Sequence, residues 1–211
     1  MKTRERILLV SLELFNAEGE PNVTTVDISN ELGISPGNLY YHFKGKDEIV
    51  NELFARFYEQ FNVILRAPLQ RPLAIEDYWF YLVVLFEHIN TYRFLYRNIS
   101  LISQRYEQIQ RPLLRIIKMK VDASQAICDQ MKAAGAIKID DDLIPALANN
   151  MALTITYWLN FDNLLNNRSG DAGQLIRDGV MQVITQIVPY MAELKAPFME
   201  AVTALYNNYR E

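Results

Sequence analysis

The spacing of apolar residues constrains the fold of this chain more than any other feature. After residue 46, long stretches place apolar residues three and four positions apart, as on the buried face of a helix. No segment rich in Val, Ile and Thr alternates apolar and polar residues between turn residues, which would indicate a strand. The sequence therefore predicts an all-α fold, with a small N-terminal domain (residues 1–46) and a larger helical domain (residues 47–211).

Glycine and proline residues divide the chain into helices. In the N-terminal domain, we expect helices over residues 2–18, over 25–32 and from Pro36 to about Phe43. A fourth helix should run to about Leu65 and end in a turn marked by Pro68 and Pro72. The remaining helices are expected over residues 75–90, 91–98, 106 or 112 to 134, 143–167, 171–193 and 197–209.

The second and third helices are spaced as a helix-turn-helix. Thr24 is expected to cap residues 25–32, and Asp27 stands three positions later, where it can complete a capping box. Gly33 ends that helix, and Ser35 caps the next one with Pro36 in its first turn. Two short helices joined by a brief turn containing glycine are typical of this DNA-binding motif.

The third helix carries groups suited to DNA. A helix reads bases in the major groove only if its first residues are slim enough to approach the base edges, and Pro36, Gly37 and Asn38 meet that requirement. Hydroxyl and imidazole groups for phosphate oxygens come from Thr25, Ser35, Tyr40, Tyr41 and His42. Positive charge comes from Lys44 and Lys46, and a second cluster can come from Lys2, Arg4 and Arg6.

This stretch resembles the tetracycline-repressor (TetR/AcrR) family of bacterial transcription regulators. The resemblance covers about residues 4–53, and it is carried by Leu14, Phe15, Gly19, Thr25, Ile28, Gly33, Ser35, Gly37, Leu39, Tyr40, His42, Phe43 and Lys46. It implies phosphate contacts from Thr25, Tyr40, His42 and Lys46, and positions near the bases for Pro36, Gly37, Asn38 and Tyr41. Tyr40 can equally be a packing residue, and His42 a structural hydrogen-bonding residue. Ser29 stands where the family usually has alanine.

Composition narrows the function further. The formal net charge of −4 confines any contact with nucleic acid to a local patch. The single cysteine, Cys128, fits a reducing cytosol, and we find no secretory signal, so we expect a cytoplasmic protein. The family resemblance implies that it is bacterial and associated with the nucleoid when bound to DNA. Residues 143–161 are uncharged, but they carry Asn and Thr side chains, so we expect a buried helix and no membrane partner.

Catalytic signals are missing from the sequence. We find no nucleophile–base pair, no phosphate-binding loop and no metal-ligand spacing, so we expect no enzyme, no cofactor and no metal. Asp140, Asp141 and Asp142 are better explained by the positive end of the helix that follows them.

Aromatic residues concentrate between Tyr78 and Tyr106. The alternatives are an aromatic core and a pocket with apolar walls and a few polar groups. Family resemblance favours a pocket for a small, largely hydrophobic or aromatic effector. The expected ligand-binding residues are Tyr78, Trp79, Tyr81, Phe86, His88, Tyr92, Phe94, Tyr96, Tyr106 and Trp158.

Basic residues gather over residues 93–120, where Glu107 is the only acidic residue. They are Arg93, Arg97, Arg105, Arg111, Arg115, Lys118 and Lys120, and Arg111, Arg115 and Lys118 share one helix face. This is a solvated face, or else it balances the charge of an anionic effector or of a protein partner.

The helices expected over residues 143–167 and 171–193 are apolar almost all round, as in helices buried on more than one side. The family resemblance implies that such a pair forms a four-helix bundle with a second copy, although a monomer core is the alternative. The expected dimer interface comprises Met151, Ile155, Trp158, Val180, Ile184, Ile187 and Met191.

Together these features predict a homodimeric repressor that a small effector releases from a double-stranded, pseudo-palindromic operator. In the alternative, the DNA-binding domain is the same, but the C-terminal domain binds a protein partner instead of a small molecule.

Overall fold

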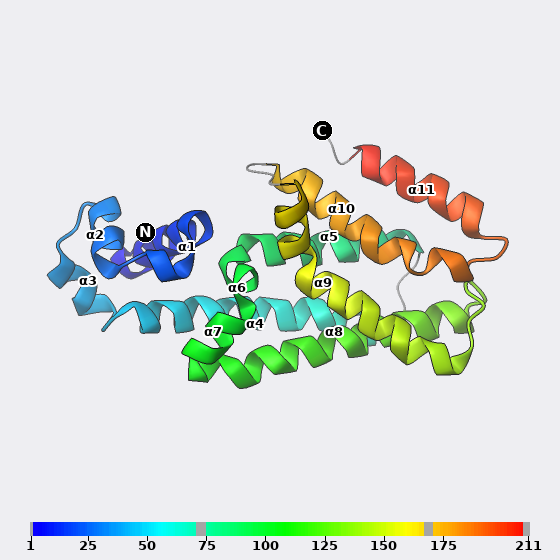
Figure 1. Cartoon of the computed structure of the whole chain (residues 1–211), viewed down its shortest axis with the longest axis horizontal. Coiled ribbons are helices and arrows are strands. Elements are labelled where there is room, and N and C mark those ends of the chain that lie inside the picture. The colour runs from blue at the N-terminus through cyan, green and yellow to red at the C-terminus, as the bar shows by residue number, and fades with distance from the viewer. Residues whose placement is uncertain (1, 71–74, 167–170, 209–211) are drawn as a thin grey trace. The chain divides into compact units, whose positions relative to one another are not determined.

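The computed structural model describes residues 2–70, 75–166 and 171–208. Within these ranges all regular elements are helices and no strand occurs, so the all-α prediction is confirmed (Figure 1). The chain folds as two compact units, which are Met1–Gln60 with Tyr92–Leu113, and Phe61–Thr91 with Leu114–Glu211. The division after residue 46 stays a prediction.

The first unit contains the N-terminal helices and a segment from the middle of the chain that holds two short helices. Its elements are α1 (Thr3–Glu18), the 3₁₀ turn η1 (Glu20–Asn22), α2 (Thr25–Leu32), α3 (Pro36–His42), the start of α4 (Lys46–Gln70), α6 (Arg93–Arg97), α7 (Ile99–Arg105) and the start of α8 (Glu107–Ala133). Ile7, Phe15, Ile28, Leu39 and Phe43 are at most 1% exposed and form its core.

The helix-turn-helix begins and ends at the residues that the sequence predicts. Thr24 Oγ1 accepts a hydrogen bond from the Asp27 amide at 3.2 Å, and Asp27 Oδ2 accepts one from the Thr24 amide at 2.8 Å. This reciprocal pair is the predicted capping box. Gly33 ends α2 with a φ of 66°, and Ser35 Oγ accepts from the Asn38 amide at 3.2 Å to cap α3.

The end of α4 differs from the prediction. We expected it to stop near Leu65 before a turn at Pro68, but it continues to Gln70 with Pro68 inside it. Proline so near the end of a helix removes one hydrogen bond of the last turns, which costs less than a proline at mid-helix. The Pro68 carbonyl also accepts a bond from Gln130 Nε2 at 2.7 Å. Pro72 lies outside the described residues.

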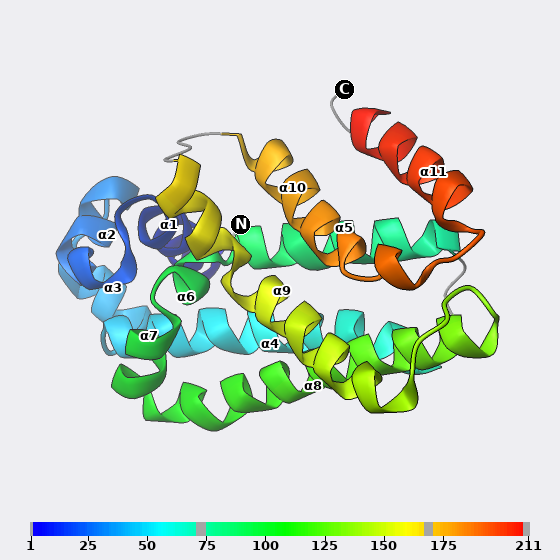
Figure 2. The ribbon, with the colours of Figure 1, turned by 45° about the vertical axis from the view of Figure 1, so that its right-hand side comes forward.

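The second unit holds the rest of α4 and α8 together with α5 (Ile75–Thr91), η2 (Asp141–Leu143), α9 (Ile144–Asn166), α10 (Ala172–Thr185), η3 (Val188–Tyr190) and α11 (Lys195–Asn208). In both ribbon views α10 lies beside α5 and α9 (Figure 2). The expected helix over residues 171–193 is broken after Thr185, since Pro189 cannot continue it. The expected ends at Asn167 and Tyr209 lie outside the described residues.

Two other boundaries were predicted incorrectly or left open. The helix expected over residues 91–98 corresponds to α6, which is shorter at both ends, and α7 at Ile99–Arg105 was not predicted; Asn98 separates the two in a non-helical conformation (φ −133°, ψ 46°). The long helix α8 begins at Glu107, so Pro112 lies within it rather than at its start.

Gly179 fixes the packing of three helices in the second unit. A Cβ atom built on it would lie 2.6 Å from Cδ1 of Trp158 on α9 and 2.9 Å from Cε1 of Phe86 on α5. Trp158 is itself held in place, because its Nε1 donates to the Leu175 carbonyl at 2.9 Å. Only a residue without a side chain allows α10 to approach the two rings this closely.

Candidate nucleic-acid interface

α3 presents one face to solvent and one to the core of the first unit. Leu39 and Phe43 are buried, whereas Tyr41 is 84% exposed and Tyr40 is 51% exposed. The first-turn residues Pro36, Gly37 and Asn38 are exposed as well. The exposed face therefore contains the small residues predicted to approach bases, next to the two tyrosines.

Hydroxyl groups from α2 and α3 meet at the edge of this face. Thr25 Oγ1 lies 3.1 Å from Tyr40 OH, within hydrogen-bond distance. Tyr41 packs edge-on against the half-buried His42, with ring centroids 5.0 Å apart. The structure thus brings together two of the predicted phosphate-binding residues, Thr25 and Tyr40, and leaves both hydroxyls at the surface.

Lys46 points into the first unit, contrary to what a phosphate contact needs. Its Nζ donates to the carbonyls of Glu20 and Val23, each at 2.9 Å, and lies 2.9 Å from Glu20 Oε1. An ammonium group has three protons, so these partners can use all of them. Lys46 therefore holds the loop that precedes α2, and its ammonium group is engaged within the first unit.

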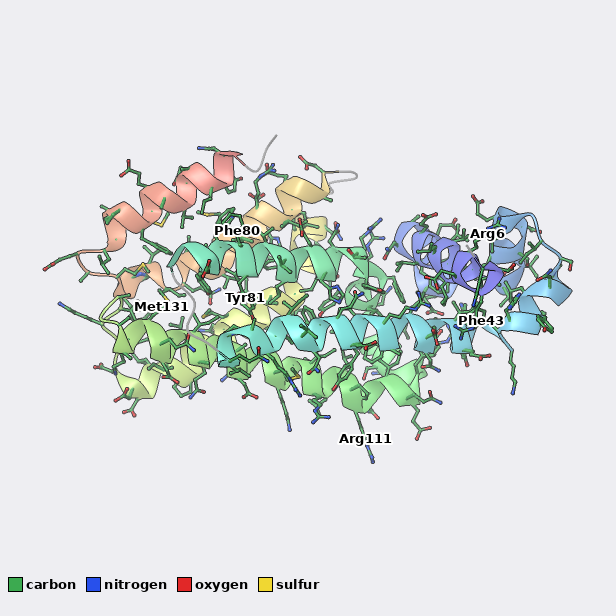
Figure 3. The ribbon with its side chains drawn as sticks, turned by 180° about the vertical axis from the view of Figure 1, so that it is seen from behind. Arg6, Phe43, Phe80, Tyr81, Arg111 and Met131 are labelled. Carbon is green, nitrogen blue, oxygen red and sulfur yellow. The ribbon has the colours of Figure 1, made fainter. Side chains whose placement is uncertain are left out.

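The other basic residues of the first unit differ in their solvent exposure and in whether they form ion pairs. Lys44, Lys2 and Arg6 are exposed (Figure 3 labels Arg6 on α1). Arg4 instead pairs with Glu52 at 3.1 Å, and its guanidinium lies 4.5 Å from the centre of the Phe43 ring. Hydrogen bonding to Arg4 lowers the pKa of the Glu52 carboxyl. Arg4 therefore links α1 to α4 and contributes less free charge than the sequence suggested.

Glu20 is a buried acceptor that we did not predict from the sequence. It is 1% exposed, and its Oε1 accepts a hydrogen bond from Tyr106 OH at 2.5 Å and lies 3.5 Å from Arg105 Nη1. Burial, followed by the bond to Glu20, raises the pKa of Tyr106. Together with Lys46, these residues hold the loop before α2 against α4 and the start of α8. An acidic residue next to Gly19 and Pro21 gives no sequence signal for such a role.

The predicted ligand-binding residues are divided between the two units. Tyr92, Phe94, Tyr96 and Tyr106 belong to the first unit, and Tyr78, Trp79, Tyr81, Phe86, His88 and Trp158 to the second. In the first unit they have structural partners: Phe57 packs on Tyr92 and Tyr96, with ring centroids 5.5 and 5.9 Å away, and Phe94 packs on Phe15 at 5.4 Å. Such ring contacts are expected if the aromatic residues of the first unit form a core.

A buried polar group in the second unit was also missed. Lys120, on α8, is 1% exposed and its Nζ donates to Thr156 Oγ1 on α9 at 3.1 Å. From the sequence we grouped Lys120 with the basic run, of which Arg111, Arg115 and Lys118 are indeed exposed. Arg111 extends away from α8 in Figure 3. A signal was present, since Lys120 lies four residues after the core residue Ile116 on the same helix face.

Two family models agree on what kind of protein this is. Residues 7–53 match the family described as "Bacterial regulatory proteins, tetR family", and residues 56–198 match the one described as "Bacterial transcriptional repressor" (TetR). The second match alone covers more than half of the chain. This chain belongs to the TetR family.

Relatives of this TetR-family protein with solved structures differ in how similar they are. A TetR-family transcriptional regulator from Marinobacter aquaeolei VT8 is 36% identical over 100% of both chains, with a TM-score of 0.84. SmeT, the repressor of the Stenotrophomonas maltophilia multidrug efflux pump SmeDEF, is 19% identical over 92% of each chain with a TM-score of 0.62, and shows likeness of fold only.

The curated relatives match this family member over a short stretch. The uncharacterized HTH-type transcriptional regulator TtgW of Pseudomonas putida is 39% identical over 54 residues, which are 26% of this chain and 40% of TtgW. SrpR of Pseudomonas putida is 37% identical over 54 residues, which are 26% of this chain and 25% of SrpR. The chain therefore matches less than half the length of these relatives.

The residues predicted for the dimer interface of this TetR-family chain are buried within the single chain, and the interface itself stays a prediction. Met151, Ile155, Trp158, Val180, Ile184, Ile187 and Met191 are all at most 8% exposed within the single chain, where they form the core of the second unit. Two positions along a helix correspond to about 200° of rotation, so the opposite face of α9 starts at Leu153. That face is apolar and exposed: Leu153 is 58%, Tyr157 45%, Phe161 57% and Leu164 89% exposed.

Among the helices built from described residues, none has the length and hydropathy required to cross a membrane.

Proposed function

We propose that this protein is a transcriptional repressor that binds a double-stranded operator through α3, as a homodimer, and is released by a small effector. The exposed face of α3 carries the proposal. It combines three slim residues at the start of the helix with an 84% exposed Tyr41, on a motif whose two helices are both capped. Such a helix can enter the major groove with its first residues against the base edges.

The residues of this motif divide into two roles. Asn38 has an amide that can both donate to and accept from a base, with Pro36, Gly37 and Tyr41 beside it. Phosphate contacts are assigned to Thr25, Ser35, Tyr40, His42 and Lys44. The Thr25–Tyr40 pair offers two hydroxyl groups to one phosphate, since the oxygens are only 3.1 Å apart. Lys46 is left out of the DNA contacts because the loop before α2 already occupies its ammonium group.

The dimer surface is assigned to the exposed apolar stripe on α9. Leu153, Tyr157, Phe161 and Leu164 are large apolar side chains about one helical turn apart, each at least 45% exposed. Contiguous exposed apolar surface of this kind marks an interaction site in a water-soluble protein. A twofold dimer uses the same patch on both copies, which explains a single stripe on one helix.

The effector site belongs to the second unit under this proposal. SmeT is named as the repressor of a multidrug efflux pump, and a γ-butyrolactone receptor shares the fold with a TM-score of 0.69 at 13% identity. The fold thus occurs in a protein named as the receptor of a small molecule. The rival proposal, a C-terminal domain that binds a protein, is favoured by the basic residues Arg111, Arg115 and Lys118, which are all exposed.

Selection of bound sequences from random double-stranded oligonucleotides tests DNA recognition. The purified protein should enrich a pseudo-palindromic site, and Asn38→Ala should change which bases are enriched. Thr25→Val, as the matched variant, should weaken binding to all sequences alike, since a phosphate contact carries no sequence information. Recovery of no preferred sequence would refute the proposal, and an equal loss for Asn38→Ala on all sites would move Asn38 to the phosphate contacts.

A further inference from the structure

The last turn of α1 caps a helix that lies far along the chain. Tyr92, the residue before α6, makes no side-chain cap for that helix. Asn16 Oδ1, on α1, instead accepts a hydrogen bond from the Phe94 amide at 3.0 Å. The first amides of a helix have no partner within it, and a buried one needs an acceptor from elsewhere. Asn16 is 6% exposed, so this cap lies inside the first unit.

α6 caps the end of α1 in return. Arg97 Nη1 donates to the Asn16 carbonyl at 2.6 Å. The last carbonyls of a helix lack partners within it and form its negative end, where a guanidinium is favourable. α1 has no basic residue of its own in its last turn. The adjacent Phe15 and Phe94 rings pack together, and α1 and α6 lie side by side in Figure 2.

A second buried attachment follows four residues later. Glu20 Oε1 accepts from Tyr106 OH at 2.5 Å and lies 3.5 Å from Arg105 Nη1, at the junction between α7 and α8. We call this contact the Glu20 anchor, and the contacts of Asn16 with α6 the Asn16 anchor. Both anchors join residues 16–20, which precede α2, to residues 92–113.

Neither anchor is part of the helix-turn-helix itself. The capping box of α2 and the Ser35 cap of α3 are made within residues 24–38. Asn16 and Glu20 are buried, and both lie outside the exposed face of α3 that is assigned to DNA. The anchors therefore take no direct part in reading bases. They attach the motif to residues 92–113.

Residues 92–113 continue into the second unit at both ends, before Tyr92 and after Leu113. The motif is thus connected to the rest of the chain through α4 and through the two anchors. A twofold dimer on a pseudo-palindrome binds best when the separation of its two recognition helices matches that of the half-sites. Without the anchors α4 alone would hold each motif, and a motif with more freedom to turn would match several separations.

We propose that Asn16 and Glu20 are positioning residues that fix the spacing between the two half-sites of the operator. The inference rests on the proposed function, since it requires a homodimer on a pseudo-palindromic site. Each added base pair moves one half-site by about 3.4 Å along the duplex and turns it by about 35°. Two firmly held motifs should therefore discriminate between neighbouring spacings.

Operators that differ only in spacing test this proposal. The full-length protein is titrated by fluorescence anisotropy with the selected operator and with versions whose spacer is one or two base pairs shorter or longer. The wild type should bind one spacing best. Tyr106→Phe removes only the hydroxyl that donates to Glu20, and should reduce the ratio of affinities between the best and the neighbouring spacings about fivefold, as expected for one buried hydrogen bond. The bases preferred within each half-site should stay the same.

Two further variants keep the test decisive. Asn16→Ala removes the cap of α6 and should reduce the same ratio about fivefold; it decides the question if circular dichroism shows that Tyr106→Phe fails to fold. Gln104→Ala is the matched control, since Gln104 is exposed on α7 two residues before Tyr106, and it should keep the wild-type ratio. If both anchor variants keep that ratio, or lose affinity equally for all spacings, the anchors only stabilise the fold and the proposal is overturned. A change in one variant alone assigns the spacing to that anchor and refutes the role of the other.

The wild-type protein separates this inference from the function on which it rests. Selection that enriches no sequence refutes operator binding, and the inference with it. A wild type that enriches a half-site but binds all spacings equally supports sequence-specific binding and overturns the positioning role of Asn16 and Glu20.

Discussion

Substitution of Gly179 by alanine should destabilise the second unit, although alanine is the better helix former. The added Cβ would lie 2.6 Å from Trp158 Cδ1 and 2.9 Å from both Trp158 Nε1 and Phe86 Cε1. These are atoms of rigid rings that are at most 8% exposed, so neither ring can swing into solvent without opening the core. Any shift of the indole also strains its 2.9 Å hydrogen bond to Leu175.

The expected magnitude follows from three opposing contributions. Alanine gains about 1 kcal/mol over glycine in a helix interior. Inserting a methyl group into a filled core costs about 1–3 kcal/mol, and loss of the indole hydrogen bond costs about 1 kcal/mol. The free energy of unfolding of Gly179→Ala should therefore fall by about 1–3 kcal/mol.

Urea unfolding followed by circular dichroism measures this change. The midpoint should fall without a change in the slope, at one fixed protein concentration because a dimer's stability depends on it. Gly173→Ala is the matched control, since it lies in the first turn of the same helix, where its Cβ would lie 3.3 Å from Arg177 Nη1 and 3.4 Å from Asp171 Oδ1 and would meet no ring. Its stability should change little. A Gly179→Ala protein as stable as the wild type would refute the packing argument.

Three further predictions concern charge and assembly. Lys44→Ala should reduce the slope of log affinity for the operator against log salt concentration by about one. Lys46→Met should leave that slope unchanged and lower the melting temperature. A reduced slope for Lys46→Met would restore Lys46 to the DNA contacts. Tyr157→Lys should shift the protein from dimer to monomer in sedimentation experiments, and an unchanged dimer would place the interface elsewhere. Burial lowers the pKa of Lys120 to about 7 in the folded protein. Between about pH 7 and 10 the unfolded chain therefore binds a proton on this lysine that the folded protein does not bind. The free energy of unfolding of the wild type should rise with pH relative to that of Lys120→Met, by at most about 1.4 kcal/mol per pH unit. Parallel stability curves for the two proteins would contradict this.

Local signals predicted the helix-turn-helix well, since caps act within a few residues of the chain. Thr24 and Asp27 form their capping box through atoms three residues apart, and Gly33 ends α2 because glycine readily adopts its positive φ. The same holds for Ser35, which caps α3. These outcomes depend on neighbours in sequence and need no knowledge of the rest of the fold.

Side chains that reach distant partners were not predictable in this way. Lys46 was expected at a phosphate, and instead reaches carbonyls that lie 23 and 26 positions earlier in the chain. Lys120 was counted with exposed basic residues, although its position in the helical period placed it next to core residues. A long flexible side chain can extend to solvent or to the interior. Which of these it does depends on the hydrogen-bond acceptors that the fold brings near it, and those cannot be read from the sequence.

The sequence by itself determined the helical class of this protein, the position of its DNA-binding motif and the residues on the exposed face of α3, because periodicity and capping are local properties. Only the tertiary structure decided which faces of the apolar helices are inside. α9 is apolar on two opposite faces, and the packing of α10 against one of them at Gly179 buries Ile155 and leaves Tyr157 exposed. Burial is a property of several helices together, so a single helix pattern that is apolar all round cannot specify it.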